Sequence, residues 1–230
     1  MSSNLTQAER RRLERKRRRT LNLIIVAGVS LIAAGFVLYV ALRPIDDLIE
    51  ITPQTYPVPV DGLTIGDPEA PVLVEVFEDF QCPSCKQFSD AIKPQVLQSF
   101  VYTGVARFQF RQYPFLGGDS FRAANAAMCA DEQGRFWDFH DILFANQLAE
   151  NVGAFSDRRM EAMADLLGLD IETWSACVNA NEFEAAVQAD LAEGRDRGVT
   201  GTPTIFVNGT RVAQNDFPSI ATAINAAAGP

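Results

Sequence analysis

The sequence predicts an α/β domain with an inserted α-helical subdomain, preceded by one transmembrane helix. Three observations lead to this prediction: an uncharged apolar stretch at residues 21–42, two strand-like runs around a helical pattern at residues 71–115, and a series of helical patterns at residues 119–196. With 230 residues and 47% hydrophobic composition, the chain can bury one sizeable core.

The charge of the chain is unevenly distributed. Residues 1–20 hold eight of the 20 basic residues and two acidic ones, a local net charge of +6. The rest of the chain has a net charge of −15, which argues against a nucleic-acid platform. We expect residues 1–20 to be a basic cytoplasmic tail.

Residues 21–42 are long enough to cross a lipid bilayer. They contain no charged residue over 22 positions, and such a helix would extend ~33 Å against a hydrocarbon core of ~30 Å. The alternative is a cleaved signal peptide, whose apolar core is usually only ~7–15 residues long. Because the basic residues precede the span, the positive-inside rule predicts a single-pass protein of the cell membrane, with a cytoplasmic N-terminus and an extracytoplasmic body.

The next segment, residues 43–60, has four prolines and no helical apolar stripe. It predicts an extended linker that lifts the following domain, expected at residues 61–228, off the membrane.

The first strand and helix of the domain can be placed from local patterns. Residues 71–77 (PVLVEVF) are β-branched and apolar, which predicts a buried strand. Pro83 suits the first turn of a helix, and Pro94 should interrupt that helix. The apolar residues at intervals of four between and beyond these prolines are Phe88, Ile92, Val96 and Phe100.

This placement puts Cys82 at the N-cap of the helix and Cys85 one turn inside it. The free amides and partial positive charge of a helix N-terminus stabilise a thiolate, so Cys82 suits a redox nucleophile and Cys85 a resolving thiol. The alternatives are an inert pair and a zinc site. Zinc would need two more ligands, and Cys129, Cys177 and His140 do not have such a spacing.

The remaining elements follow in order. Residues 105–115 alternate between apolar and polar side chains, as in a strand, and residues 119–196 show helical patterns. Residues 204–207 (TIFV) predict a strand, Asn208-Gly209 a tight hairpin turn into a second short strand, and residues 217–228 a closing helix.

Four segments carry a resemblance to a known family: DGLTIGDPEAPV, FEDFQCPSCKQF, RFWDFHDILF and GVTGTPTIFVNG. Together they resemble the DsbA-like family, thiol:disulfide oxidoreductases of the bacterial cell envelope with a thioredoxin fold, over residues ~61–228. The helical block at 119–196 accounts for the 121 positions between Cys82 and Pro203, more than a bare thioredoxin needs.

The resemblance implies a site and its partners. Cys82 and Cys85 would be the catalytic pair, with Pro83 and Ser84 between them. Thr202 and a cis-Pro203 would face the pair and offer backbone to an extended client; the alternative for these two residues is an ordinary turn. The implied partners are exported polypeptides with free thiols and a quinone-linked membrane oxidase of the DsbB or vitamin K epoxide reductase type. No cofactor and no metal ion is expected.

Two features depart from the family pattern. Ser84 stands where the strongest oxidants of the family carry histidine, so we expect a milder oxidant. Related folds often place a buried acid six residues before the first cysteine, where this chain has Val76, and strand alternation turns Glu75 to the other face. Glu78 or Asp79 could assist proton transfer instead, the alternative being solvated charges at the strand end.

Three further residues of the helical block are candidates for roles away from the redox pair. His140 lies on an amphipathic helix rich in aromatic residues, and we expect a core or edge histidine. Cys129 and Cys177 lie on apolar stripes of two predicted helices. Some DsbA-like proteins carry a second, structural disulfide there, so the resemblance favours a Cys129–Cys177 bond over two separate buried thiols.

The function implied by the resemblance is a membrane-tethered oxidoreductase that introduces disulfides into exported proteins. One alternative uses the same chemistry as a reductase or isomerase. The other is a non-catalytic binding module, against which the intact CPSC segment argues.

Overall fold

The computed structural model describes residues 7–42, 45 and 47–229. It divides into two units, one ending at residue 46 and one beginning at residue 47. Residues 1–6, the start of the predicted basic tail, lie outside the described part, as do residues 43, 44 and 46 of the predicted linker and residue 230.

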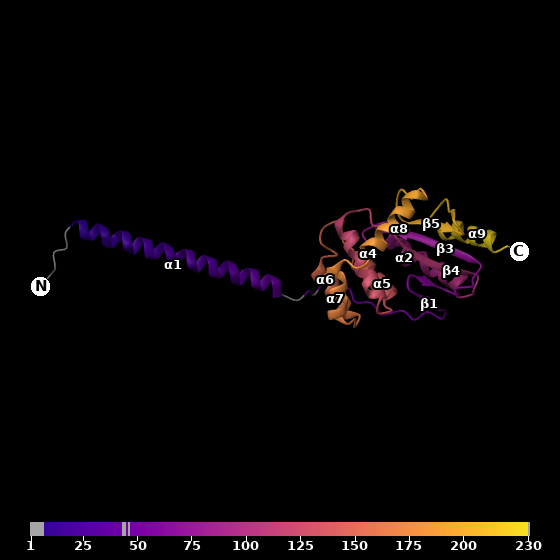
Figure 1. Cartoon of the computed structure of the whole chain (residues 1–230), viewed down its shortest axis with the longest axis horizontal. Helices are drawn as coiled ribbons and strands as arrows, with labels where there is room; N and C mark the ends of the chain where they lie inside the picture. Colours follow the sequence, from indigo (N-terminus) through magenta and orange to yellow (C-terminus); the bar gives the residue numbers. More distant parts are fainter. Residues whose placement is uncertain (1–6, 43–44, 46, 230) are drawn as a thin grey trace. The chain divides into compact units, whose positions relative to one another are not determined.

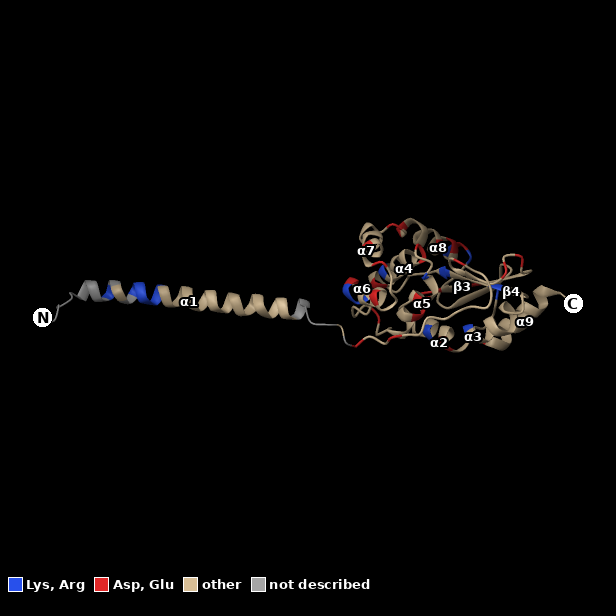
Figure 2. Ribbon diagram, turned by 90° about the horizontal axis from the view of Figure 1, so that it is seen from below, with Lys and Arg blue, Asp and Glu red and all other residues tan. Residues whose placement is uncertain are grey.

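The described residues of the first unit form the helix α1 (Gln7–Leu42) (Figure 1). Its basic residues gather towards its N-terminal end, as the blue ribbon in Figure 2 shows. Residues 15–39 are long and apolar enough to cross a membrane, and their apolar side chains are exposed, Leu31 and Ile32 to 75% each. Exposure of so many apolar side chains to water is unfavourable, which is consistent with a segment that lies in an apolar environment.

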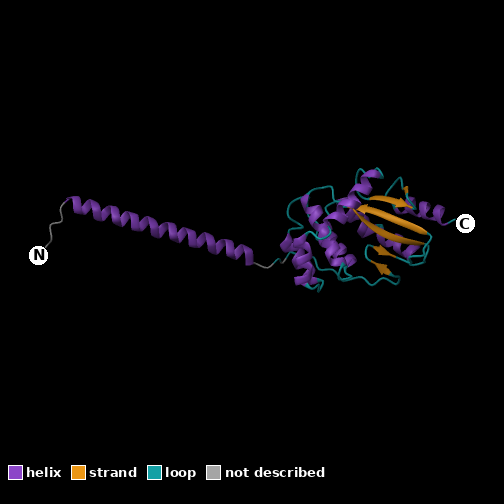
Figure 3. Cartoon of the chain, in the orientation of Figure 1, coloured by secondary structure: helices purple, strands orange, loops and turns teal. Residues whose placement is uncertain are grey.

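The second unit is built on a six-stranded sheet in the order β1-β2-β4-β3-β5-β6 (Figure 3). Its strands are β1 (Val60–Asp61), β2 (Thr64–Ile65), β3 (Val72–Glu78), β4 (Ala106–Gln112), β5 (Thr204–Val207) and β6 (Thr210–Arg211). The central strand β3 pairs in parallel with β4 and antiparallel with β5. β1 and β2 were not predicted, because two-residue strands carry no measurable alternation in the sequence.

The helices follow the predicted order. Around the sheet lie α2 (Pro83–Ala91), α3 (Lys93–Val96), the π-helical turn η1 (Leu97–Val101) and α9 (Phe217–Ala228). The inserted block consists of α4 (Gly118–Asp131), α5 (Phe136–Ala145), α6 (Asp157–Leu166), α7 (Ile171–Ala180) and α8 (Glu184–Asp196). The helix after the cysteines breaks at Ile92, directly before Lys93-Pro94, as predicted.

Alternation along β3 separates two faces of the sheet. Val74 and Val76 are fully buried in the main core, together with Cys85. Phe77 points to the opposite face and packs with Leu191 of α8 and Phe206 of β5. Side chains at even-numbered positions of β3 therefore face the side on which the cysteines lie.

The hairpin between β5 and β6 turns at Asn208-Gly209. Both residues have positive φ values, 45° and 77°, as a two-residue hairpin turn of this type requires. This prediction is confirmed.

Residues 47–59 correct the prediction of an extended linker. We call them the N-terminal strap. Its partly buried apolar side chains pack against the core of the domain. The side chain of Asn146, the residue directly after α5, accepts the Ile49 amide at 2.7 Å and donates to the Ile49 carbonyl at 2.8 Å. Tyr56 meets the Trp137 ring edge-on at 6.4 Å. Burial of these apolar side chains outweighs the conformational entropy that the Pro-rich segment loses when it becomes ordered.

The helical block contains a disulfide between Cys129 of α4 and Cys177 of α7. Both cysteines are largely buried, and Trp174 of α7 donates its indole N–H to the Ala126 carbonyl of α4 at 3.1 Å. The two helices are therefore joined covalently and by packing.

Candidate functional site

The cysteine pair lies where β3 ends and α2 begins. The Cys82 amide donates to the Asp79 carbonyl at 2.9 Å, which turns the chain between strand and helix. Cys82 is the N-cap residue of α2, with Pro83 following it in the first turn. Cys82 is 7% exposed and Cys85 is 0% exposed, whereas Pro83 and Ser84 face solvent. The predicted helix-end position of the pair is confirmed.

The loop before β5 faces this pair. The Thr202–Pro203 peptide bond is cis, and the Cys82 thiol donates to the Thr202 carbonyl at 3.3 Å. The Thr202 hydroxyl is buried and has no hydrogen-bond partner within the described residues. That hydroxyl is therefore available to a thiolate at Cys82.

The two thiols differ in acidity. The pKa of Cys82 is lowered to about 6, first by a hydrogen bond from the Cys85 thiol and further by Thr202 and the backbone amides of Ser84 and Cys85, against the opposing effect of burial. Burial raises the pKa of Cys85, and its bond to Cys82 and the charge of Glu78 raise it further. Cys82 therefore suits attack on or release from a partner sulfur, and Cys85 suits resolution of the resulting bond.

Titration of the reduced protein tests this difference. We expect thiolate absorbance to rise with an apparent pKa of about 6 for Cys82, and the Cys82→Ala variant should lose this transition. Because the unfolded chain still holds this proton at neutral pH, the free energy of unfolding of the reduced protein should increase from about pH 6 to pH 8 relative to the oxidised protein. An apparent pKa at or above ~8.5 would contradict the helix-end argument.

Glu78 and Asp79 are both buried, which excludes the expectation of solvated strand-end charges. The Asp79 carboxylate accepts the amides of Gln81, Phe115 and Leu116 at 2.8–3.0 Å, and so ties the loop before Cys82 to the chain after β4. Both carboxylate oxygens of Glu78 lack a hydrogen-bond partner within the described residues.

Glu75 behaves as strand alternation predicts. It points to the opposite face of β3, where it binds Arg111 at 3.0 Å and Arg197 at 2.7 Å. Val76 is fully buried on the face of the cysteines.

Gln147 supports the active-site loop and was missed by the sequence analysis. Its side-chain amide donates to the carbonyls of Phe80 at 2.7 Å and Cys82 at 3.0 Å. It lies just beyond α5, so the inserted block holds the backbone of the first cysteine. Nothing in the local sequence signals this contact, because the two segments are 65 positions apart.

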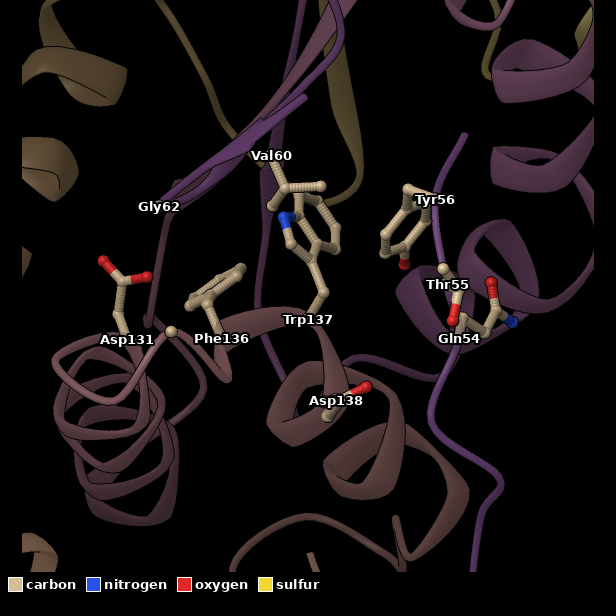
Figure 4. Close-up of a pocket in the computed structure, with 10 residues that line it drawn as sticks. Gln54, Thr55, Tyr56, Val60, Gly62, Asp131, Phe136, Trp137 and Asp138 are labelled. Atoms are coloured by element: carbon tan, nitrogen blue, oxygen red, sulfur yellow. The ribbon is translucent and has the colours of Figure 1, made fainter. Parts of the chain in front are cut away.

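A cavity of ≈300 Å³ lies between the N-terminal strap and the helical block (Figure 4). Tyr56 of the strap and Trp137, Phe136 and Asp138 of α5 line it, with Asp131 on its other side. None of its lining residues belongs to the CPSC or cis-Pro loop, so the redox chemistry lies elsewhere. Across the described residues, no group of three or more His, Cys, Asp or Glu side chains is arranged to hold a metal ion.

The sequence of this chain is similar to that of known proteins. A family model described as Thioredoxin matches residues 59–226. Disulfide bond formation protein D of Bacillus subtilis is 32% identical over 155 residues, covering 63% of this chain and 66% of that protein.

The fold of this chain is also similar to those of solved structures. The crystal structure of oxidised BdbD from Bacillus subtilis superposes with a TM-score of 0.68 at 28% identity, covering 73% of this chain and 92% of that one. DsbA of Chlamydia trachomatis superposes with a TM-score of 0.61 at 25% identity, over 79% and 95% of the two chains. The region that the family model matches, residues 59–226, includes both cysteines and the cis-Pro loop. The chain therefore belongs to the thioredoxin family, as a DsbA-like thiol:disulfide oxidoreductase.

Proposed function

We propose that this protein is tethered to the membrane by α1 and introduces disulfides into exported proteins through Cys82 and Cys85. The observation that carries the proposal is the Cys82 thiol at the start of α2, 3.3 Å from the Thr202 carbonyl and with a pKa lowered to about 6. A stabilised thiolate favours the reduced form of the pair, so the oxidised form readily takes electrons from client thiols.

The proposed reaction has two exchange steps. A client thiolate attacks the Cys82 sulfur of the Cys82–Cys85 disulfide, and Cys85 leaves with the electron pair of the broken bond. A second client thiolate then attacks the client sulfur of the mixed disulfide and releases Cys82 as a thiolate. The client gains one disulfide, and its two electrons remain on Cys82 and Cys85.

The Thr202–Pro203 loop would orient the client in this proposal. The Thr202 carbonyl, directly before the cis bond, lies next to Cys82, and an extended client segment can pair with such backbone as an added strand. Pro83 and Ser84 are exposed at the same end of α2, so a client can approach the Cys82 sulfur from that side.

The proposal also includes location and partner. The exposed apolar surface of α1 and the basic residues at its N-terminal end support a membrane anchor with the catalytic unit on the extracytoplasmic side. Each reduced pair must be reoxidised, so we propose a quinone-linked membrane oxidase of the DsbB or vitamin K epoxide reductase type as electron acceptor.

The test uses the oxidised full-length protein in detergent and a reduced, unfolded model client. We expect each chain to transfer one disulfide to the client, and equilibration with glutathione buffers should give a reduction potential between those of protein disulfide isomerase and DsbA, about −180 and −120 mV. A potential near the thioredoxin value of about −270 mV would indicate a reductase and contradict the proposal.

A further inference from the structure

Tyr113 joins the two loops that meet at the redox pair. It directly follows β4 and is 5% exposed. Its backbone amide donates at 2.9 Å to the carbonyl of Glu78, at the end of the strand that leads to Cys82. Its phenol hydroxyl donates at 2.7 Å to the carbonyl of Val199, in the loop that leads to Thr202. One residue therefore contacts both the chain before the first cysteine and the loop that faces it.

Side chains hold the carbonyls of this loop, residues 198–203. Four of these carbonyls accept a side-chain hydrogen bond: that of Gly198 from Arg211, that of Val199 from Tyr113, that of Gly201 from Thr204 and that of Pro203 from Asn215. The Thr202 carbonyl instead accepts from the Cys82 thiol at 3.3 Å. The backbone is thus fixed on both sides of the carbonyl that faces the redox pair.

The bond from Tyr113 differs from the other three in its environment. It is buried, whereas the bond from Arg211 is exposed and those from Thr204 and Asn215 are partly buried. A carbonyl that loses an exposed donor can bind water, but a buried carbonyl without a donor bears the full penalty of desolvation. Removal of the Tyr113 hydroxyl should therefore displace the Val199 carbonyl, and with it the loop.

The ring of Tyr113 is confined between β3 and α8. It meets the Phe77 ring edge-on, with the centroids 6.1 Å apart. On its other side it lies against the backbone of Gly194, where an added Cβ atom would be 2.7 Å from two ring carbons. Only glycine allows α8 to pass so close to the ring. The sheet and the helix together therefore set the position of the hydroxyl.

The proposed function, on which this inference rests, makes the spacing of the two loops important. A client segment that pairs with the loop as an added strand lies about 4.7–4.9 Å from it, and its thiolate must still reach the Cys82 sulfur. A misplacement of about 1 Å can slow a reaction about 100-fold. A small dithiol such as dithiothreitol does not pair with the loop, so its attack does not depend on this spacing.

We propose that Tyr113 is a positioning residue for polypeptide clients. By holding the Val199 carbonyl from the end of β3, it keeps the loop at the spacing from which a bound client reaches the Cys82 sulfur. It does not touch the reacting sulfur atoms. Its contribution therefore lies in the preference for extended polypeptide thiols over small thiols, and not in the reactivity of the disulfide itself.

The test compares two single-turnover reductions of the oxidised full-length protein in detergent, one by a reduced, unfolded polypeptide with two cysteines and one by dithiothreitol. Tyr113→Phe keeps the ring and removes only the hydroxyl. We expect its rate constant with the polypeptide to fall about tenfold, a size that the loss of one buried hydrogen bond can produce. Its rate constant with dithiothreitol should stay within about twofold of wild type, because small thiols do not use the loop.

Tyr56→Phe is the matched control. It also removes a buried phenol hydroxyl, but one without a hydrogen-bond partner among the described residues. Both of its rate constants should equal those of the wild-type protein within about twofold, because no hydrogen bond is lost. Gly194→Ala reaches the same contact from α8: the added Cβ displaces the Tyr113 ring while the tyrosine remains, and the rate with the polypeptide alone should fall.

The ratio of the two rate constants decides the outcome. A wild-type ratio in Tyr113→Phe or in Gly194→Ala would overturn the inference, because the contact would then not be needed. An equal fall with both reductants would also overturn it, since the defect would then lie in the redox pair and not in client positioning. Failure of the wild-type protein to oxidise the polypeptide, with normal reduction by dithiothreitol, would instead refute the proposed function.

Discussion

Replacement of Cys82 with alanine is expected to abolish disulfide transfer to a reduced client. Without Cys82 the disulfide that would be transferred to the client cannot form, and the remaining Cys85 is fully buried and out of reach of a client sulfur. Replacement of Cys85 with alanine has a different expected result: a client activated with its own disulfide should remain bound to Cys82, because the resolving thiol is gone. Non-reducing electrophoresis and mass spectrometry of full-length protein mixed with client distinguish the two outcomes.

Ser84→Ala serves as the control for these variants. Ser84 is exposed and influences Cys82 through its backbone amide, which alanine keeps. Transfer should stay within a few-fold of wild type. If Cys82→Ala still transferred disulfides, or if the stable mixed disulfide formed through Cys85 instead, the assignment of the two thiols would be wrong.

Removal of the Cys129–Cys177 disulfide is expected to cost about 4 kcal/mol of unfolding free energy on the chain-entropy account of a 48-residue loop. The double variant Cys129→Ala/Cys177→Ala is appropriate, because a single replacement would leave one unpaired thiol. Urea unfolding followed by the fluorescence of Trp137 and Trp174 measures the difference, with the catalytic pair oxidised in every sample that contains it.

The variant Cys82→Ala/Cys85→Ala is the comparison for this experiment. It also removes two buried cysteines, but their disulfide closes only a short loop, for which the same account gives a smaller effect. A loss below about 1 kcal/mol for the Cys129/Cys177 variant would mean that packing between α4 and α7 already restrains the unfolded chain or compensates in the folded one.

Local chemistry made part of the fold predictable. The helix-end position of Cys82 follows from a β-branched run and a proline directly after the cysteine, and the turn at Asn208-Gly209 follows from backbone preferences. Both depend on residues within a few positions of each other, so the sequence contains the whole signal.

Other features depend on contacts between distant segments and could not be predicted. The N-terminal strap lacks periodicity, and its order comes from Asn146 and Trp137, about 80 to 100 positions away. The same holds at the site: Glu78 resembles a polar strand end until His140 of the inserted block is placed against it. Burial of a charged side chain is a property of its neighbours, which a single sequence does not reveal.

The disulfide of the helical block forms by thiol:disulfide chemistry, which is also the class of reaction that the mature protein performs. Maturation of the protein therefore depends on that chemistry. A newly made chain contains four cysteines, and the bond between α4 and α7 must form before the block that holds the Cys82 backbone through Gln147 has its full stability. In a compartment that keeps thiols reduced, this bond does not persist. Chains retained there would carry the same sequence with a less stable scaffold. With the extracytoplasmic location proposed above, the supply of working enzyme would be coupled to export and to the oxidant present outside the cytoplasm.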